Sequence, residues 1–317
     1  MTQISAKIVA DSISQGKRIT TFELEYPRFI HSELMTHRVF SRNAMSSRAV
    51  PIEKMIEQVR TNPATPIHWG QNQAGMQAKE EVSGEDKYGN DRKELLKSRW
   101  HEAAKFQASF AQEFSDHGLH KQVVNRILEP FQTMKTVLTS TEFENFYWLR
   151  NHEDAQPEIK KLAEEMLKAQ EESEPLELKV GDWHLPYFET SFWDGDWPAL
   201  IVNGIEYSLE DAKAISASCC AQVSYRKLDD SLEKALNVYK RLVESEPVHA
   251  SPFEHQATPM NFRYGADLWK AAKEQGVDEP LFEDGTTHMD YVGNFWSGNF
   301  CGWIQHRQLI PNNVKKG

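Results

Sequence analysis

The stretch Thr36-His37-Arg38-Val39-Phe40-Ser41-Arg42-Asn43-Ala44-Met45-Ser46-Ser47-Arg48 is the densest polar cluster of the chain, with three arginines, three serines, a histidine and an asparagine. Apolar residues at helical spacing precede it, so we expect a helix over 29–40 that leads into a polar loop. Arginine offers a planar fork of donors that suits phosphate. The stretch is therefore either an anion site or simply a solvated, charged helix end.

The spacing in this stretch resembles a family signature. His37-Arg38, seven residues and then Ser46 are similar to the Arg-His-Arg-x7-Ser motif of flavin-dependent thymidylate synthases, the ThyX family. Five positions fall where that signature places them, namely Arg38, Ser41, Asn43, Ser46 and Arg48. Two positions depart from it: Thr36 replaces the first arginine, and Ala44 replaces the usual acidic residue.

Two segments of the second half resemble the flavin-contacting segments of that family. His249-Ala250-Ser251-Pro252-Phe253-Glu254-His255 is similar to its His-x-Ser/Thr-Pro-Phe-Glu-His segment. Ala221-Gln222-Val223-Ser224-Tyr225 is similar to its Arg-Val-Ser-Tyr segment, whose serine lies near the flavin.

Two further segments resemble family positions that contact ligands. Asn125-Arg126-Ile127-Leu128-Glu129-Pro130 is similar to a segment whose arginine binds the substrate phosphate. The run 145–159 is similar to Asn-Phe-x-x-Leu-Arg-x4-Ala-Gln-x-Glu-Ile, in which the arginine, here Arg150, reaches the flavin. The family arginine that reaches the pyrimidine base corresponds to Lys160, which lacks the bidentate fork of arginine.

The order of these segments differs from that of the family, in which the flavin-contacting segments come first. The chain therefore resembles a permuted, phage-type member, and Gln305-His306-Arg307 echoes the signature as a remnant of the joint. We expect one catalytic domain, 1–317, with a nucleotide and signature half over 1–174 and a flavin-contact half over 175–317. The segment 66–76 has no counterpart in the family pattern and is either a substrate-contact loop or a surface turn.

The pattern of apolar residues predicts an α/β fold with a mixed sheet and long helices, as the resemblance also implies. Strands are expected around 6–10, 19–26 and 258–262. A helix is expected at 91–114, with an apolar face formed by Leu95, Leu96, Trp100, Ala103, Phe106, Phe110 and Phe114. Further helices are expected at 141–148, 154–170, from the capping residue Ser208 through Cys219, and from Ser231 through Val243. The charged run 171–175 is the best linker candidate, 77–90 is an exposed excursion, and 264–290 is an insertion.

Composition narrows the class of protein. The 317 residues carry a net charge of −11, which argues against general nucleic-acid binding but not against a small anionic ligand held by local arginines. No apolar run reaches the length of a membrane span and no secretory leader is visible. Three cysteines without metal-ligand spacing indicate neither a disulfide framework nor a metal site, and a cytoplasmic location (that of the host, if phage-encoded) is expected.

The resemblance implies reductive methylation of dUMP to dTMP, with FAD as bound cofactor, NADPH as reductant and methylenetetrahydrofolate as carbon donor, in a homotetramer that shares sites between chains. It implies that Ser46, Arg48 and Arg38 are catalytic. Substrate contacts would come from Glu33, Ser46, Ser47, Arg48, Arg126 and Lys160. Flavin contacts would come from His37, Arg38, Ser41, Asn43, Arg150, Ser224, Ser251 and Glu254. Glu33 is included because it lies one helical turn before His37.

Three alternatives remain open. The departures at Thr36, Ala44 and Lys160 concern the nucleotide, so another pyrimidine deoxynucleotide such as dCMP is a possible substrate. A catalytically silent protein that binds a nucleotide or flavin would share the same motifs. A helical interaction protein without a small ligand is the third alternative.

Overall fold

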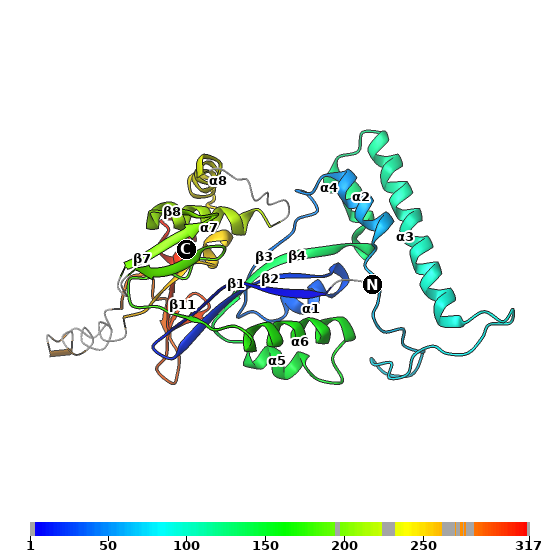
Figure 1. Ribbon diagram of the computed structural model, residues 1–317, viewed down its shortest axis with the longest axis horizontal. Coiled ribbons are helices and arrows are strands. Elements are labelled where there is room, and N and C mark those ends of the chain that lie inside the picture. The colour runs from blue at the N-terminus through cyan, green and yellow to red at the C-terminus, as the bar shows by residue number, and fades with distance from the viewer. Residues whose placement is uncertain are drawn as a thin grey trace.

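The computed structural model describes residues 4–193, 197–223, 232–261, 270, 273–274, 276 and 282–315 (Figure 1). Its centre is a five-stranded sheet in the order β3-β4-β2-β1-β5. The strands are β1 (Ser5–Ser14), β2 (Lys17–Pro27), β3 (Ser41–Ala44), β4 (Thr133–Ser140) and β5 (Leu176–Glu177). Only β1 and β5 pair in parallel, so the sheet is mixed, as predicted.

The first two strands form a hairpin with a two-residue turn. Gln15 and Gly16 both have positive φ, at 50° and 78°, which matches the twist of an antiparallel pair. Glycine adopts this conformation without steric cost. The alternating pattern that predicted a strand over 19–26 is confirmed by β2.

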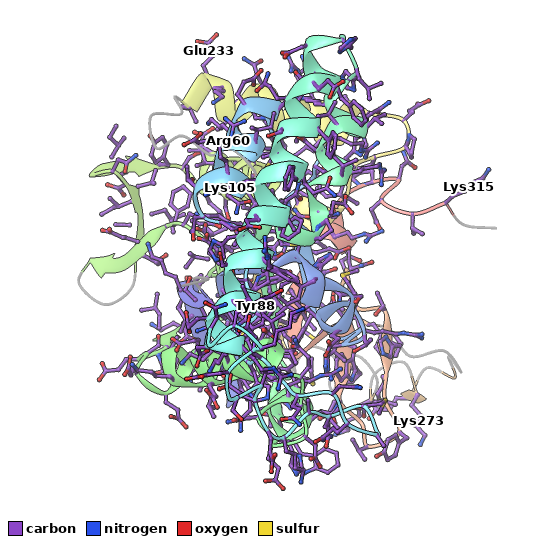
Figure 2. The ribbon with its side chains drawn as sticks, turned by 90° about the vertical axis from the view of Figure 1, so that its right-hand side faces the viewer. Arg60, Tyr88, Lys105, Glu233, Lys273 and Lys315 are labelled. Atoms are coloured by element: carbon purple, nitrogen blue, oxygen red, sulfur yellow. The ribbon has the colours of Figure 1, made fainter. Side chains whose placement is uncertain are left out.

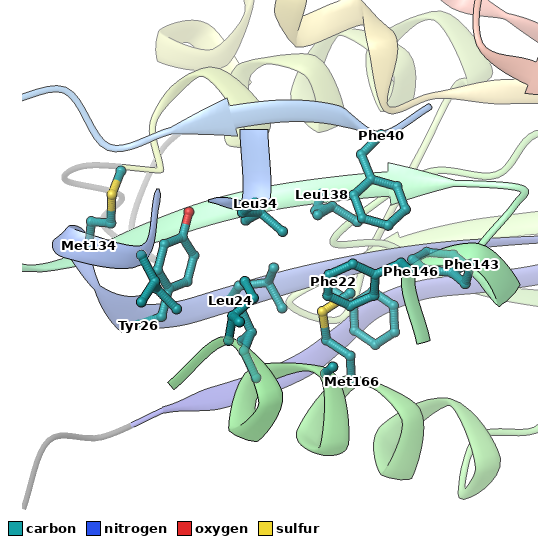
Figure 3. Packing of buried hydrophobic residues seen from close by; sticks show 14 residues of the cluster. Phe22, Leu24, Tyr26, Leu34, Phe40, Met134, Leu138, Phe143, Phe146 and Met166 are labelled. Atoms are coloured by element: carbon teal, nitrogen blue, oxygen red, sulfur yellow. The ribbon is translucent and has the colours of Figure 1, made fainter. Parts of the chain in front are cut away.

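Two helices cover one side of this sheet and close the main core (Figure 3). They are α5 (Glu144–Arg150) and α6 (Pro157–Glu171), close to the predicted 141–148 and 154–170. Helix α6 begins where Gln156 accepts hydrogen bonds from the backbone of Glu158 and Ile159. Its buried side, which includes Leu162 and Met166, packs on the strands.

A separate helical unit stands at one end of the molecule (Figure 1). It contains α2 (Ile52–Thr61), α3 (Arg92–Asp116) and α4 (Lys121–Ile127), around a second hydrophobic cluster. The long helix is confirmed, but its expected apolar face is wrong. Ala104, Ala108 and Ala111 are the fully buried residues of α3, whereas Phe106, Phe110 and Phe114 are exposed.

The described part of the second half carries smaller sheets, the helices α7 and α8, and short helical turns. Helix α7 (Leu209–Ala221) begins at the predicted cap, where Ser208 accepts from the backbone of Asp211, and α8 (Leu232–Glu244) follows. The remaining strands are β6 (Glu189–Trp193), β7 (Trp197–Val202), β8 (Ile205–Tyr207), β9 (Ala257–Pro259), β10 (His288–Met289), β11 (Phe295–Ser297), β12 (Phe300–Cys301) and β13 (Trp303–Gln305). Short helices are η1 (Arg28–Ile30), α1 (His31–Met35), η2 (Glu129–Phe131), η3 (Ser251–Glu254) and α10 (His306–Leu309).

Three other expectations are corrected here. The helix over 29–40 is limited to η1 and α1, and the stretch that we took for a polar loop contains strand β3, because Ser41–Ala44 pairs with β4. The linker candidate 171–175 leads directly into β5 of the same sheet. Most of the 264–290 insertion lies outside the described residues. Among the residues described, no helix has the length and apolar character needed to cross a membrane.

Candidate functional site

Arg150, the last residue of α5, is held by three side chains of the 33–37 segment. Its Nε donates to Nε2 of His37 at 2.9 Å, and its Nη2 donates to Oγ1 of Thr36 at 3.2 Å. Its Nη1 lies 3.5 Å from a carboxylate oxygen of Glu33. Helix α1 turns these groups toward α5, and the ring of His37 rests edge-on against Phe146, at 4.9 Å between ring centroids. The signature segment and the 145–150 segment therefore meet.

His37 is neutral in this arrangement. Burial, together with the positive charges of Arg150 and Arg42, lowers the pKa of its imidazole to about 4. An arginine can only donate, so Nε2 of His37 is the acceptor and its proton resides on Nδ1. His37 thus orients the guanidinium of Arg150 and carries no charge of its own near pH 7.

Beside this network lies a cavity of about 1030 Å³. Three predicted site residues line it, namely Glu33, Arg150 and Lys160. Its charged lining is mixed and consists of Glu33, Lys79, Arg150, Glu153, Asp154, Glu158, Lys160, Lys161 and Glu164. Glu33 is paired with Arg150, and Lys161 is paired with Glu165 at 2.6 Å. Lys79 and Lys160 form no ion pair with any residue that the structure describes, so their ammonium groups remain available to an anion.

The segment 66–79 forms another wall of the cavity, and it includes 66–76, whose role the sequence left open, and the start of the predicted 77–90 excursion. The backbone N–H of Ile67 donates to Oε1 of Glu158 at 2.8 Å, and Nε2 of Gln77 donates to the carbonyl of Asp154 at 2.9 Å. These bonds attach the segment to the start of α6. Sequence reasoning missed Glu158 as a positioning residue, although its place in the Ala-Gln-x-Glu-Ile run was a usable signal.

A second group gathers between β3, η3 and the C-terminal echo segment. Glu254 forms an ion pair with Arg307. Oγ of Ser41 donates to Oδ1 of Asn299 at 3.1 Å and accepts from Nε2 of Gln305 at 3.2 Å. Asn43 donates to the carbonyl of Cys220 at 3.3 Å. Ser251 is exposed at the start of η3.

Arg42 connects the first two groups, although it was not among the predicted site residues. Its Nη1 donates to the carbonyls of Leu34 and His37, at 3.2 and 3.1 Å. Burial lowers the pKa of its guanidinium, and the carboxylate of Glu254 acts against that shift. Arg42 lies between the matched signature positions Ser41 and Asn43, and this place in the sequence could have indicated it.

A third group occupies the turn after β3 and the neighbouring α4. Nδ2 of Asn125 donates to the carbonyls of Ser47 and Val50, at 2.7 and 3.1 Å, and thereby attaches the turn to the helix. The backbone N–H of Arg48 donates to Oγ of Ser46 at 3.3 Å. The side chains of Arg48 and Arg126 are exposed and do not line the cavity.

Arg38 and Ser224 are the remaining predicted residues. Arg38 is exposed. Ser224 lies outside the described residues. Within the described ranges, no group of three or more His, Cys, Asp or Glu side chains is arranged to hold a metal ion.

Comparison with known proteins gives a family and several structural likenesses. A family model described as "Thymidylate synthase complementing protein" (Thy1) matches residues 18–176. No curated protein matches the sequence. The UMP/dUMP methylase PolB from Streptomyces cacaoi, bound with 5-Br dUMP, is 17% identical over 54% of this chain and 90% of its own, with a TM-score of 0.41. Thymidylate synthase X from Helicobacter pylori, with FAD and dUMP, is 15% identical over 48% of this chain and 67% of its own, with a TM-score of 0.35.

Proposed function

The chain belongs to the family of thymidylate synthase complementing proteins, and we propose that it is a flavin-dependent enzyme that methylates C5 of dUMP. Methylenetetrahydrofolate would supply the carbon, and NADPH would reduce the flavin. In such a reaction the cofactors perform the difficult steps, and the protein binds and orients them.

One observation carries the proposal: segments remote in the sequence converge on one cavity. Glu33 and His37 come from the signature region, whereas Arg150 and Lys160 come from α5 and α6. Three of the four line the same space, and the fourth, His37, holds Arg150 in place. The motif resemblance indicated His37, Arg150 and Lys160, and Glu33 was indicated by its place one helical turn before His37.

The residues present fit a flavin cofactor. Small-ligand pockets are usually about 300–1,000 Å³, and this cavity of about 1030 Å³ is at the upper end of that range. FAD carries a pyrophosphate, to which Lys79 and Lys160 could offer ammonium groups that form no ion pair within the described residues. When bound, FAD would supply the hydride that reduces the nucleotide adduct. Arg150, fixed by His37, Glu33 and Thr36, would face the flavin without a further loss of side-chain freedom.

We propose the remaining roles by family resemblance. Ser46 and Ser47 would lie beside the nucleotide, and Arg38, Ser46 and Arg48 would be the catalytic set. Arg48 and Arg126 would hold the phosphate of the nucleotide. Because Arg38, Arg48 and Arg126 are exposed, a homotetramer would allow them to meet ligands that another copy holds.

The permuted order and the two halves, 1–174 and 175–317, are part of the same proposal. Contacts across the halves support them as one catalytic unit. The echo residue Gln305 bonds Ser41 of the signature strand, and Asn43 of the same strand donates to the carbonyl of Cys220. Ser41, Asn43, Ser224, Ser251 and Glu254 would then form the second part of the flavin site.

The test is turnover by the purified full chain with dUMP, methylenetetrahydrofolate, NADPH and FAD. We expect dTMP, and we expect Arg150→Ala to lower kcat/KM by about 100-fold because a charge-assisted contact is lost. Lys168→Ala, on an exposed part of α6 outside the cavity, is the matched control and should retain wild-type activity.

Substrate identity is tested by replacing dUMP with dCMP in the same assay. Lys160 stands where the family has a base-reading arginine, so the Lys160→Arg variant should strengthen the preference for dUMP. Methylation of dCMP alone would contradict the dUMP assignment. Flavin binding without turnover of either nucleotide would indicate a silent homologue and would overturn the proposal of activity.

A further inference from the structure

The segment 66–79 lines the cavity without belonging to any of the family motifs. Its lining residues are Pro66, Ile67, His68, Gly70, Met76, Gln77, Ala78 and Lys79. The segment lies between α2 and α3 in the chain. Figure 2 looks onto this end of the molecule, with Tyr88 shortly before the start of α3. A wall that no motif accounts for is the part of the cavity where this chain can have a ligand preference of its own.

A buried carboxylate holds the beginning of this segment. Glu158 lies in the first turn of α6 and is 2% exposed. Its Oε1 accepts the backbone N–H of Ile67 at 2.8 Å, and its Oε2 accepts from Nε2 of Gln156. These two hydrogen bonds, together with the positive end of the α6 dipole, compensate the burial of the carboxylate.

Further bonds fix the rest of the segment. Nε2 of Gln77 donates to the carbonyl of Asp154 at 2.9 Å. Glu81, just beyond the segment, accepts the backbone N–H of Trp69 at 3.0 Å and forms an ion pair with Lys93 of α3. The segment is therefore attached to α6, to the turn before α6 and to the start of α3.

The two sides of the segment touch each other. Gly70 pairs with Glu81 in an isolated bridge, and a Cβ at Gly70 would lie only 2.3 Å from Cβ of Ala78. Nε2 of His68 donates to the carbonyl of Ala78 at 2.7 Å. The segment thus has a defined shape of its own, in addition to its anchors.

We propose that the segment 66–79 is the wall of the cavity that selects its ligand, and that Glu158 is the positioning residue that holds this wall in place. The ligand class is a phosphate-bearing nucleotide. The lysines of the lining suit its phosphates, and the carboxylates of the lining suit the donors of its base and ribose. The proposal rests on the proposed function, which places FAD in this cavity.

The position of the wall affects affinity because a wall that is already in place costs the ligand nothing to order. A wall that is in place only part of the time lowers the apparent affinity by that fraction. Without the carboxylate of Glu158, the N–H of Ile67 has lost its acceptor and the wall has lost its anchor on α6. The bonds of Gln77 and Glu81 remain, so the wall stays attached but is less ordered.

Hydrogen exchange tests the positioning role without any ligand. We expect Glu158→Ala to raise exchange about tenfold in peptides covering 66–79, with no rise in peptides of β2 and β4. Glu158→Gln has one acceptor and one donor, so it can satisfy only Ile67 or Gln156 and should give an intermediate rise. Asp182→Ala is the matched control, because its carboxylate accepts the backbone N–H of Lys179 at 2.8 Å outside the cavity. Unchanged exchange in Glu158→Ala, or an equal rise throughout the chain, would overturn the positioning role.

Binding measurements on the full chain test the selecting role, with FAD followed by its fluorescence and dUMP as the second probe. We expect Glu158→Ala to raise the Kd of FAD about tenfold, and FAD to slow exchange of 66–79 in the wild type. Gln77→Ala removes an exposed anchor, so it tests the same wall without disturbing the core, and it should also raise the Kd of FAD.

The outcomes separate this proposal from the proposed function. An unchanged Kd of FAD in both variants would overturn the selecting role, and a loss of affinity confined to dUMP would overturn the assignment of the wall to FAD. A wild-type chain that binds no FAD would refute the proposed function, and the exchange experiment would still decide whether Glu158 holds the wall.

Discussion

Two buried histidines, His184 and His255, are joined by a chain of hydroxyl groups. Oγ of Ser12 lies 2.9 Å from Nδ1 of His184, and Nε2 of His184 lies 2.8 Å from Oγ1 of Thr21. Thr21 contacts Thr139 at 2.8 Å, and Thr139 contacts Nδ1 of His255 at 2.8 Å. Burial lowers the pKa of both imidazoles to about 3, so each has one donor and one acceptor. Each hydroxyl can accept from one neighbour and donate to the next, so the chain can form with all its donors pointing the same way.

Breaking the middle of this chain should destabilise the whole fold. We expect Thr139→Val to lower the free energy of unfolding by about 1–3 kcal/mol, because it leaves a buried ring nitrogen of His255 without a partner at nearly unchanged volume. Thr133→Val, at the first residue of the same strand, is the control and should change it by less than about 0.5 kcal/mol. Urea unfolding measures both, and equal effects of the two substitutions would refute this account.

At the scale of elements, the sequence predicted those features that local residue patterns determine. Helices α6 and α7 begin within a few residues of the expected positions because Gln156 and Ser208 accept backbone hydrogen bonds there. Strand β3 was missed because its partner β4 lies about 90 residues later in the sequence. A four-residue strand is also too short for its alternating pattern to be recognised.

The direction of a helix face and the walls of a cavity also depend on distant contacts. The helical spacing of apolar residues predicted α3 correctly. Only the packing of α2 and α4 shows that its alanine side is buried and its phenylalanine side is exposed. The motif resemblance indicated Arg150 and Lys160, and helical spacing before His37 indicated Glu33. Neither could indicate that Ile67 is held by Glu158 and that the 66–79 segment thereby lines the same cavity.

The cap of α7 can be tested directly. Ser208→Ala should lower the free energy of unfolding by about 1 kcal/mol, since the backbone N–H of Asp211 loses its acceptor at the helix end. Ser208→Thr retains a hydroxyl and should lose only a small part of that stability. Thermal and urea unfolding of the two variants provide the comparison, and identical losses would argue against a capping role.

On the scale of the whole molecule, the two halves of the chain are joined through buried polar groups. His184 and His255 belong to the second half, yet both bond threonines of the central sheet in the first half. His306 is also buried, and its pKa is lowered to about 3 by burial and by the positive charge of Lys213. The junction therefore depends on imidazoles that stay neutral.

The buried imidazoles of the junction, together with His37 and His306, make stability depend on pH. In the folded chain His37 has a pKa near 4, and His184, His255 and His306 have pKa values near 3, whereas an unfolded histidine titrates near 6.5. Below about pH 6.5 these histidines bind protons in the unfolded chain but stay neutral in the folded chain. The stability that the neutral imidazoles contribute is therefore fully present above that pH. It is lost progressively as the pH falls toward 3–4.

Urea unfolding at several pH values between 7 and 5 should show this loss. Each buried histidine that is fully protonated only in the unfolded chain adds about 1.4 kcal/mol per pH unit to the slope of the free energy of unfolding against pH. His184→Gln, which keeps an amide donor and acceptor, should reduce the slope by about one proton. His101→Gln, on the exposed surface of α3, should leave it unchanged. A free energy of unfolding that stays constant from pH 7 to pH 5 would show that the junction tolerates charged imidazoles.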